Sequence, residues 1–230
     1  MTVKKKKQNN SNLGGDKNLT QMAYRKIKEM MFNYDIVPGQ RLIFVDFAER
    51  LGVSRTPVNN ALSILANEGF LDFIPNQGYK VHEITQKEAN DLYDIRQILE
   101  LGAIGSAIKK LTPEKLKALE NQKKLYEKSV VEQITRGRFT LDQEFHACYV
   151  QMAENCYLTD YFREVYQRIF LRHRIEGLPV GRAKEVVLEH KEILKAISMK
   201  DVENAKALIK HHIKAGKDYI FSAIFGEKSV

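Results

Sequence analysis

The sequence changes its hydrophobic periodicity at Gly69, and this change constrains the fold more than any other feature. Before Gly69, apolar residues recur at the spacing of a helix face. After it, residues 70–74 and 79–81 have the composition of two short strands, and Asn-Gln-Gly at 76–78 supplies turn residues suited to a hairpin. The region therefore passes from helices to a two-stranded hairpin within a few residues.

Helices are expected before the hairpin at 18–34, 45–51 and 55–68. Gly52 permits a tight turn between the second and third of these helices, and Ser54 is a good N-cap residue for the third. Two helices joined by a tight turn and followed by a hairpin form a winged helix-turn-helix. We expect this domain to occupy residues 17–83.

The start of the third helix carries polar side chains that can enter a DNA major groove. Arg55 can bond guanine O6 and N7 in bidentate fashion, a contact worth roughly 1–3 kcal/mol of discrimination. Ser54 and Thr56 can donate to phosphate, and the wing tip at 76–78 would lie along the backbone or in the minor groove. The alternative is that these helices only pack together and bind no DNA. The predicted DNA-binding residues are Ser54, Arg55, Thr56, Asn59, Asn76, Gln77 and Gly78.

The rest of the chain divides into a short tail and a long helical region. Residues 1–16 are rich in Lys, Asn and Gly with almost no apolar residues to bury, which predicts a flexible tail. Thr85 and Glu88 match a capping box, and the pattern after them is helical throughout. Its breaks indicate six or seven helices. We therefore expect residues 86–226 to form an all-α bundle, and the whole chain to be mostly α.

Composition excludes several classes of protein. No apolar run approaches the ~18 residues that cross a bilayer. The basic N-terminus lacks the apolar segment of a secretory signal, so we expect a cytoplasmic protein with no membrane partner. The formal net charge of +8 is compatible with nucleic acid, but the positive charge is spread over both halves and locates no binding surface. Cys148 and Cys156 form neither a C-x-x-C pair nor a disulfide framework.

Four residues of the helical region have the spacing of a metal site. Asp142 and His146 are four apart, which puts a carboxylate and an imidazole on one helix face. His190 and His212 lie on either side of a break near Asp201, and a helical hairpin there would let them face each other. Three imidazoles and one carboxylate suit a divalent ion such as Zn, Ni or Mn. By spacing alone, ordinary surface or core histidines remain an alternative.

The motifs of residues 20–82 are specific enough to indicate a family. They include Pro38-Gly39-Gln40-Arg41-Leu42, then Ala48-Glu49-Arg50-Leu51-Gly52-Val53-Ser54-Arg55-Thr56-Pro57-Val58, and Pro75-Asn76-Gln77-Gly78. This set closely resembles the GntR family of bacterial transcription regulators. The family usually has Arg directly after Pro-Val, whereas this chain has Asn59, which suits adenine N6 and N7 or phosphate. The operator preference therefore stays open.

Residues 86–222 carry a second set of motifs, Asp94-Ile95-Arg96 with Leu99-Glu100, Asp142-x-x-Phe145-His146, and Glu189-His190-x-x-Ile193-Leu194. These resemble the FCD ligand-binding domain of the FadR-like GntR branch. In many members of that branch the positions of Asp142, His146, His190 and His212 bind a metal. The resemblance also implies that Arg96 faces the effector cavity, where its guanidinium can fork onto a carboxylate. The alternative is an ion pair between Arg96 and Glu100, four residues along.

The resemblance implies a homodimer that binds an inverted-repeat operator in double-stranded DNA and responds to a small metabolite, for which we expect a carboxylate. A repressor released by its ligand is the commoner family pattern, although the sequence does not show the sign of the response. Two alternatives stay open. One is a metal sensor, in which the ion itself is the signal. The other is a metal-dependent hydrolase fused to a DNA-binding module, for which the chain offers no H-E-x-x-H motif and no nucleophile elbow.

Overall fold

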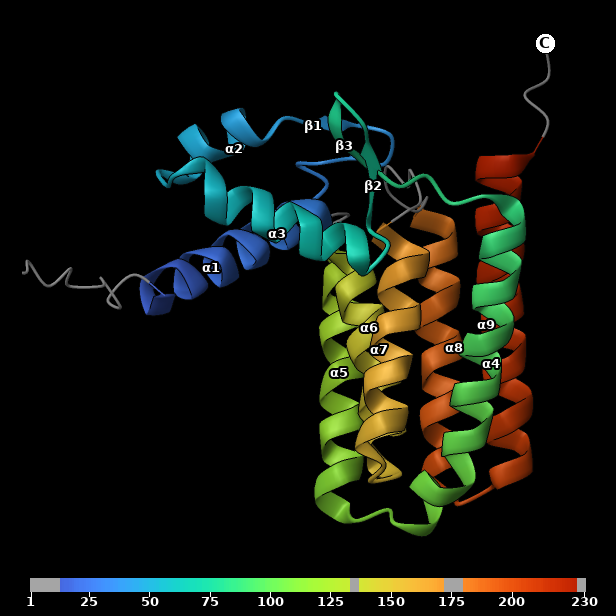
Figure 1. Cartoon of the computed structure of the whole chain (residues 1–230). Helices are drawn as coiled ribbons and strands as arrows, with labels where there is room; N and C mark the ends of the chain where they lie inside the picture. The colour runs from blue at the N-terminus through green and yellow to red at the C-terminus, as the bar shows by residue number, and fades with distance from the viewer. Residues whose placement is uncertain (1–12, 133–136, 172–179, 227–230) are drawn as a thin grey trace, which may run out of the picture. The chain divides into compact units, whose positions relative to one another are not determined.

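The computed structural model describes residues 13–132, 137–171 and 180–226. The chain divides after His82 into two compact units, Met1–His82 and Glu83–Val230, and each unit is described by itself (Figure 1). Helices make up most of both units, as the sequence predicts. Within the described ranges, no helix combines the length and the apolar character needed to span a bilayer.

The N-terminal unit contains α1 (Leu13–Phe32), β1 (Arg41–Leu42), α2 (Phe44–Leu51), α3 (Arg55–Asn67), β2 (Leu71–Ile74) and β3 (Gly78–Val81). α3 packs against α1, α2 and β2, because Val58, Ala61, Leu62 and Leu65 form a fully buried stripe along it. The strands form an antiparallel sheet in the order β1-β3-β2. The unit is the predicted winged helix-turn-helix, with one strand more than the predicted hairpin.

Two details of this unit differ from the sequence prediction. Helix α1 begins at Leu13, whereas we expected a tail through residue 16 and a helix from residue 18. Residues 13–17 read Leu-Gly-Gly-Asp-Lys, and a single apolar residue among glycines and charged residues leaves no amphipathic pattern in the sequence. Strand β1 was missed because two residues are too short for a periodicity, although Leu42 is buried and pairs with Tyr79. Residues 1–12 of the predicted tail lie outside the described residues.

The C-terminal unit is a bundle of long helices (Figure 1). Its described helices are α4 (Gln86–Lys109), α5 (Pro113–Val131), α6 (Arg138–Met152), α7 (Cys156–Leu171), α8 (Val180–Ser198) and α9 (Val202–Phe225). Thr85 caps α4 in a capping box with Glu88, as predicted. The side chains of Thr112 and Asp201 cap α5 and α9, so the local sequence fixes where these helices begin.

The packing of the bundle brings three distant segments of the chain together. α4 packs against α6, α7 and α9, while α8 packs against α5 and α9. The helices α6, α8 and α9 each turn a buried polar residue inward among aliphatic and aromatic side chains. These inward polar residues define the candidate site.

Candidate metal centre and DNA-binding surface

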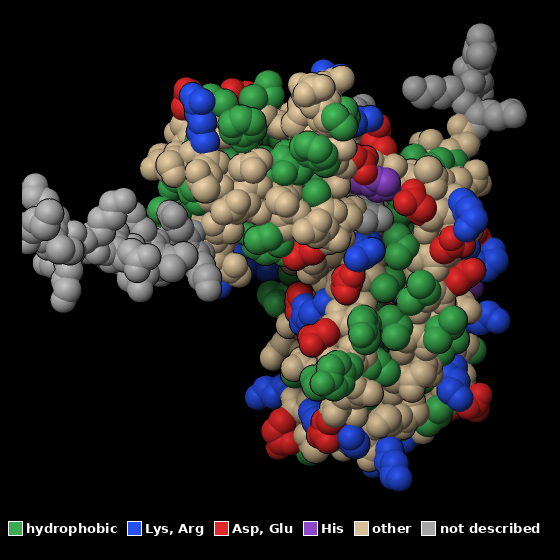
Figure 2. All heavy atoms as spheres, in the orientation of Figure 1, with side chains coloured by type: hydrophobic (Ala, Val, Ile, Leu, Met, Phe, Trp, Pro, Cys, Tyr) green, Lys and Arg blue, Asp and Glu red, His purple; other side chains and the backbone are tan. Residues whose placement is uncertain are grey.

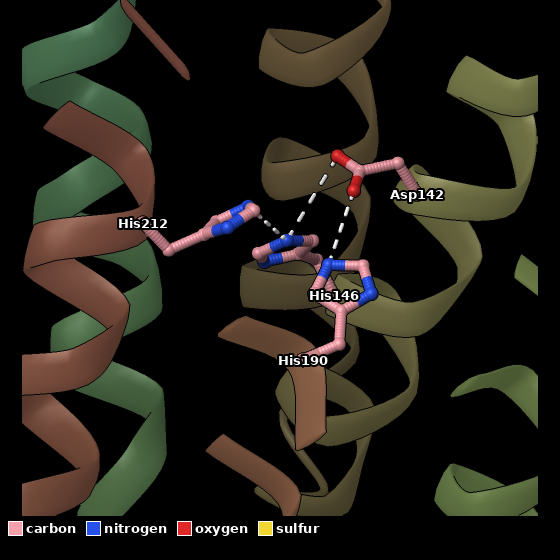
Figure 3. Close-up of side chains that lie close together, drawn as sticks. All are labelled: Asp142, His146, His190 and His212. Atoms are coloured by element: carbon pink, nitrogen blue, oxygen red, sulfur yellow. Dashed lines mark hydrogen bonds and ion pairs between the residues drawn. The ribbon is translucent and has the colours of Figure 1, made fainter. Parts of the chain in front are cut away.

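The four predicted metal ligands meet inside the C-terminal unit. Asp142 and His146 lie one turn apart on α6, His190 comes from α8 and His212 from α9 (Figure 3). One ligand atom from each residue lies within 4.8 Å of the ligand atoms of all the others. The three histidines are buried and Asp142 is nearly so. The helical hairpin of α8 and α9 therefore brings His190 and His212 together, as the sequence predicts.

The Nε2 atoms of the histidines converge on one another and on the carboxylate. His190 Nε2 lies 3.1 Å from Asp142 Oδ1, and His146 Nε2 lies 3.0 Å from His212 Nε2. His146 Nε2 is also 3.9 Å from Asp142 Oδ2. Among the described residues, neither Asp142 Oδ1 nor either ring nitrogen of His190 has a hydrogen-bond partner. Buried polar atoms normally have one, so this cluster contains unused ligand atoms.

Two further carboxylates hold the outer nitrogens of the histidines. His146 Nδ1 lies 2.7 Å from Glu100 Oε2 of α4, and His212 Nδ1 lies 2.6 Å from Glu189 Oε2 of α8. A carboxylate that accepts from Nδ1 leaves Nε2 as the ligand atom, which is the usual second layer around a metal-bound histidine. The Tyr149 hydroxyl also donates to Glu100. Neither glutamate was among the predicted site residues. The one sequence feature that could have indicated them is that Glu100 and Glu189 each stand in a motif shared with the FCD domain.

The protonation states in the cluster suit a metal. Burial lowers the pKa of His146, His190 and His212 below the usual histidine range, so the imidazoles are neutral near pH 7. Burial opposes ionisation of Asp142, but the close approach of His190 and the positive charge that the histidines can carry hold its pKa well below the usual range. The Tyr166 hydroxyl donates to Asp142 Oδ2 at 2.5 Å. Neutral imidazoles and an ionised carboxylate are the forms that bind metal ions.

Arg96 pairs with Glu100 and also contacts the histidine cluster. Its Nε donates to Glu100 Oε1 at 2.6 Å, which is the ion pair considered as the alternative. Its guanidinium also stacks over the Tyr166 ring at 4.8 Å and reaches His146 Nε2 at 3.3 Å. Arg96 is therefore a buried neighbour of the cluster and is already paired with a carboxylate.

A cavity of about 40 Å³ lies against the cluster. Polar side chains that line it include Tyr93, Arg96, Arg138, Asp142, Arg182 and His212. Arg182 donates two hydrogen bonds to Glu189, at 2.6 and 2.9 Å. Arg138 was not predicted from the sequence as a site residue. Three arginines therefore line the cavity, Arg96, Arg138 and Arg182.

The predicted DNA-binding residues lie at the surface of the N-terminal unit. Gly52 has φ 66°, which makes the left-handed turn between α2 and α3 that glycine adopts without strain. Ser54 occupies the N-cap position of α3, but its side chain makes no cap hydrogen bond, so its hydroxyl stays available for another acceptor. Arg55, Thr56 and Asn59 are exposed on the outer face of α3. Asn60, which was not predicted, is exposed beside them.

The wing also presents its tip to solvent. Asn76 and Gln77 are exposed, Gly78 is half-buried, and Asn76 adopts φ 61° in the turn between β2 and β3. Asparagine tolerates this left-handed conformation better than most residues. The recognition-helix start and the wing tip are therefore separate exposed surfaces of the same small domain.

Comparison with protein families decides the identity of these two units. The profile of the bacterial regulatory proteins of the gntR family matches residues 19–81, and the profile of the FCD domain matches residues 91–215. The chain belongs to the GntR family and carries an FCD domain. The winged helix-turn-helix is thus the DNA-binding domain of a GntR transcription regulator, and the helical bundle is its FCD domain.

Individual relatives agree with this assignment. The GntR regulator is 29% identical over 190 residues to YdhC of Bacillus subtilis, which covers 82% of this chain and 85% of YdhC. It is 29% identical over 198 residues to the Nta operon transcriptional regulator of Aminobacter aminovorans, covering 86% of this chain and 92% of the relative. Both relatives are named as transcriptional regulators, which agrees with the family assignment and gives no support to the hydrolase alternative.

The fold is also that of a solved regulator. The structure of McbR (YncC) from Escherichia coli superposes with a TM-score of 0.79 at 22% identity, covering 89% of this chain and 98% of McbR. At this identity the likeness establishes the fold alone. The metal, the effector and the oligomeric state of the GntR regulator must be argued from its own residues.

Proposed function

We propose that this transcription regulator binds one divalent metal ion through Asp142, His146, His190 and His212, and that a small carboxylic acid bound there controls operator binding. The observation that carries the proposal is the pair of carboxylates on the outer histidine nitrogens. Glu100 and Glu189 orient two imidazoles so that their Nε2 atoms face the same point. A merely structural polar cluster would pair its inner atoms as well, but Asp142 Oδ1 and the nitrogens of His190 have no hydrogen-bond partner among the described residues.

The donor set fits a divalent ion in number and spacing. Metal–nitrogen and metal–oxygen bonds to His and Asp are about 2.0–2.2 Å long, so ligand atoms on opposite sides of an ion are roughly 4.4 Å apart. The four ligand atoms lie within 4.8 Å of one another, a few tenths of an ångström from that value. The unpaired Asp142 Oδ1 and His190 nitrogens support the same view, because ligation would satisfy them. Zn, Ni and Mn suit this nitrogen-rich set.

Four protein ligands leave room for an effector. An octahedral ion at this site would supply one or two open positions at which a carboxylate or water can coordinate. The cavity that adjoins the cluster gives such a ligand a place to lie, and Arg96 lines it beside His146. The chain's own contribution is therefore to orient the imidazoles, keep them neutral and surround the ligand with cationic groups.

Operator recognition fits the exposed residues of α3 and the wing. Arg55 at the start of α3 suits direct reading of a guanine, while Ser54 and Thr56 suit phosphate. One winged helix contacts one half-site, so two copies of the chain are needed to read an inverted repeat.

Exposed apolar residues of the C-terminal unit support the homodimer. Ile98 of α4 and Tyr157 and Tyr161 of α7 are 69%, 73% and 60% exposed, and α4 packs directly against α7. Figure 2 shows hydrophobic side chains gathered on the face of this unit that is turned to the viewer. Exposed apolar groups of this kind favour contact with a partner. We propose that a second copy covers this surface.

Effector control requires that the ligand bind two arrangements of the dimer with different affinity. The test begins with elemental analysis of protein purified without chelators. Operator binding is then measured with metal alone and with metal plus organic acids. A response to acids at constant metal supports the proposal, a response to metal alone identifies a metal sensor, and protein that takes up no metal refutes the metal site.

A further inference from the structure

The cavity beside the histidine cluster contains a buried guanidinium that no described residue pairs with. Arg138 is the first residue of α6 and is only 2% exposed. All three of its guanidinium nitrogens lack a hydrogen-bond partner in the part of the chain that the structure describes. Arginine does not lose its proton in proteins, and an unpaired buried charge is strongly unfavourable. Such a charge indicates an anionic partner that is not among the residues the structure describes.

The surroundings of Arg138 favour an anion as that partner. The first turn of α6 has no acidic residue, and its N-cap Gly137 offers no side chain to bind the free backbone N–H groups. A helix N-terminus carries partial positive charge, so it adds to the charge of Arg138. The hydroxyl of Tyr93 lines the same cavity and likewise has no hydrogen-bond partner among the residues described. Two unpaired donors therefore share the cavity.

The remaining charges around the cavity are already paired. Arg96 is bound by Glu100, and Arg182 is bound by Glu189. Among the described residues, these two pairs together with Asp142 and Arg138 give three carboxylates and three guanidinium groups. Their charges cancel when the histidines are neutral, as metal ligation requires. A divalent ion would then leave two positive charges. A dianion neutralises both, whereas a monoanion neutralises one.

We propose that Arg138 and the Tyr93 hydroxyl form a second anion subsite, which makes the regulator select effectors with two anionic groups over effectors with one. The proposal rests on the metal and effector function proposed above, because the first carboxylate of the ligand occupies the histidine cluster. The cavity of about 40 Å³ has room for on the order of three water-sized groups. The ligand class is therefore a short dicarboxylate, or a compact carboxylate with a second oxyanion group.

Matched pairs of acids test this selectivity. The full-length protein is loaded with Zn²⁺, dialysed, and titrated calorimetrically with malonate against propionate and with succinate against butyrate. The two acids of each pair have the same number of carbon atoms, but one has two carboxylates and the other has one. We expect the dicarboxylates to bind the unmodified protein more tightly. Arg138→Met should weaken dicarboxylate binding roughly 10- to 100-fold and leave monocarboxylate binding and Zn²⁺ content unchanged.

Two control variants show whether the loss belongs to the subsite. Arg163→Met removes another arginine, which is paired with Glu144 at the surface, and should leave both classes of acid unchanged. Arg138→Lys keeps the charge but loses the forked donors, so its affinity for dicarboxylates should fall between those of the original protein and Arg138→Met. Elemental analysis after each titration shows that the acid has not removed the metal.

The outcomes separate this subsite from the metal function. Equal binding of both members of each pair, or an equal loss of both in Arg138→Met, overturns the second subsite and leaves the metal and effector function standing. Protein that retains no Zn²⁺ overturns the metal function instead. In that case sulfate is titrated into metal-free protein. A thermal shift that Arg138→Met abolishes supports the anion subsite, and equal shifts in both proteins overturn it.

Discussion

His190 Nε2 on α8 lies 3.1 Å from Asp142 Oδ1 on α6, and among the described residues neither atom has a hydrogen-bond partner of proper geometry. The contact brings together two helices that are joined through α7 and far apart in sequence. One ligand atom from each of these two groups lies within 4.8 Å of a ligand atom of each of the other two histidines. The relationship explains why one ion bound by these atoms would stabilise the bundle as well as bind an effector.

His190→Ala should therefore abolish metal binding and lower thermal stability in the presence of metal. The variant removes one of the four proposed ligands, the histidine whose Nε2 lies 3.1 Å from Asp142 Oδ1. His211→Ala is the matched control, because His211 is adjacent to His212 but exposed. Elemental analysis and melting curves with and without a chelator check both variants. If the chelator lowers the melting temperature of His190→Ala as much as that of the original protein, the ligand assignment is wrong.

Arg55→Ala should remove sequence discrimination and leave the fold intact. Arg55 is exposed at the first position of α3, so its loss costs no packing. A bidentate contact with guanine contributes roughly 1–3 kcal/mol, which corresponds to about a 10- to 100-fold loss of discrimination. Binding to an operator selected from random duplexes is compared with binding to random DNA at one salt concentration. Arg25→Ala, exposed on α1, is the control and should keep its discrimination.

Acid should destabilise the metal-free protein in a range set by Glu100. Burial opposes its ionisation, but attraction to His146 and Arg96 and hydrogen bonds from His146 and Tyr149 lower its pKa from 4.5 to about 2. The unfolded state then binds the proton first, so the stability that Glu100 contributes is fully present above pH 4.5 and is lost as the pH falls toward 2. Urea unfolding at several pH values measures the slope. The free energy of unfolding of Glu100→Gln should change less between pH 4.5 and 2 than that of the original protein. An unchanged slope would contradict the lowered pKa of Glu100.

Ile98→Glu should weaken the proposed dimer. Ile98 is 69% exposed on α4, and burying a carboxylate in place of an isoleucine at an interface removes apolar burial and adds a desolvation cost. The dissociation constant should rise at least about tenfold. Sedimentation equilibrium measures it, and Leu125→Glu on α5, a residue 48% exposed, is the control. An equal effect of both substitutions would place the interface elsewhere.

The sequence predicts the two domains from local patterns, whereas it indicates the four clustered residues only when their spacing is combined with the family resemblance. Caps such as Thr85 and Asp201 and the spacing of Asp142 and His146 are visible in a few consecutive residues. Glu100 and Arg138 were not predicted as site residues, because their roles depend on which helices pack together. Glu100 reaches His146 across the contact of α4 with α6, and the isolation of Arg138 is a property of the folded cavity. The hydrophobic periodicity of the sequence therefore predicts neither the contact of Glu100 with His146 nor the lack of a partner for Arg138.

Arg138→Met should raise the stability of the metal-free and ligand-free protein. The guanidinium is 2% exposed and unpaired among the residues described, whereas methionine fills a similar volume without a charge to desolvate. An increase of about 1–3 kcal/mol is expected, and each 1 kcal/mol raises Tm by roughly 2–4 °C in a chain of this size.

Calorimetric melting of dialysed protein measures the stability change, and Arg163→Met should show no increase because it removes a paired surface arginine. A structural role for Arg138 predicts the opposite sign, since its removal would then leave a partner unsatisfied and lower the Tm. Higher stability combined with loss of dicarboxylate selectivity would mean that the charge is kept for binding at the expense of stability. A lower Tm in Arg138→Met would show that the chain itself needs this guanidinium, and the anion subsite would lose its main support.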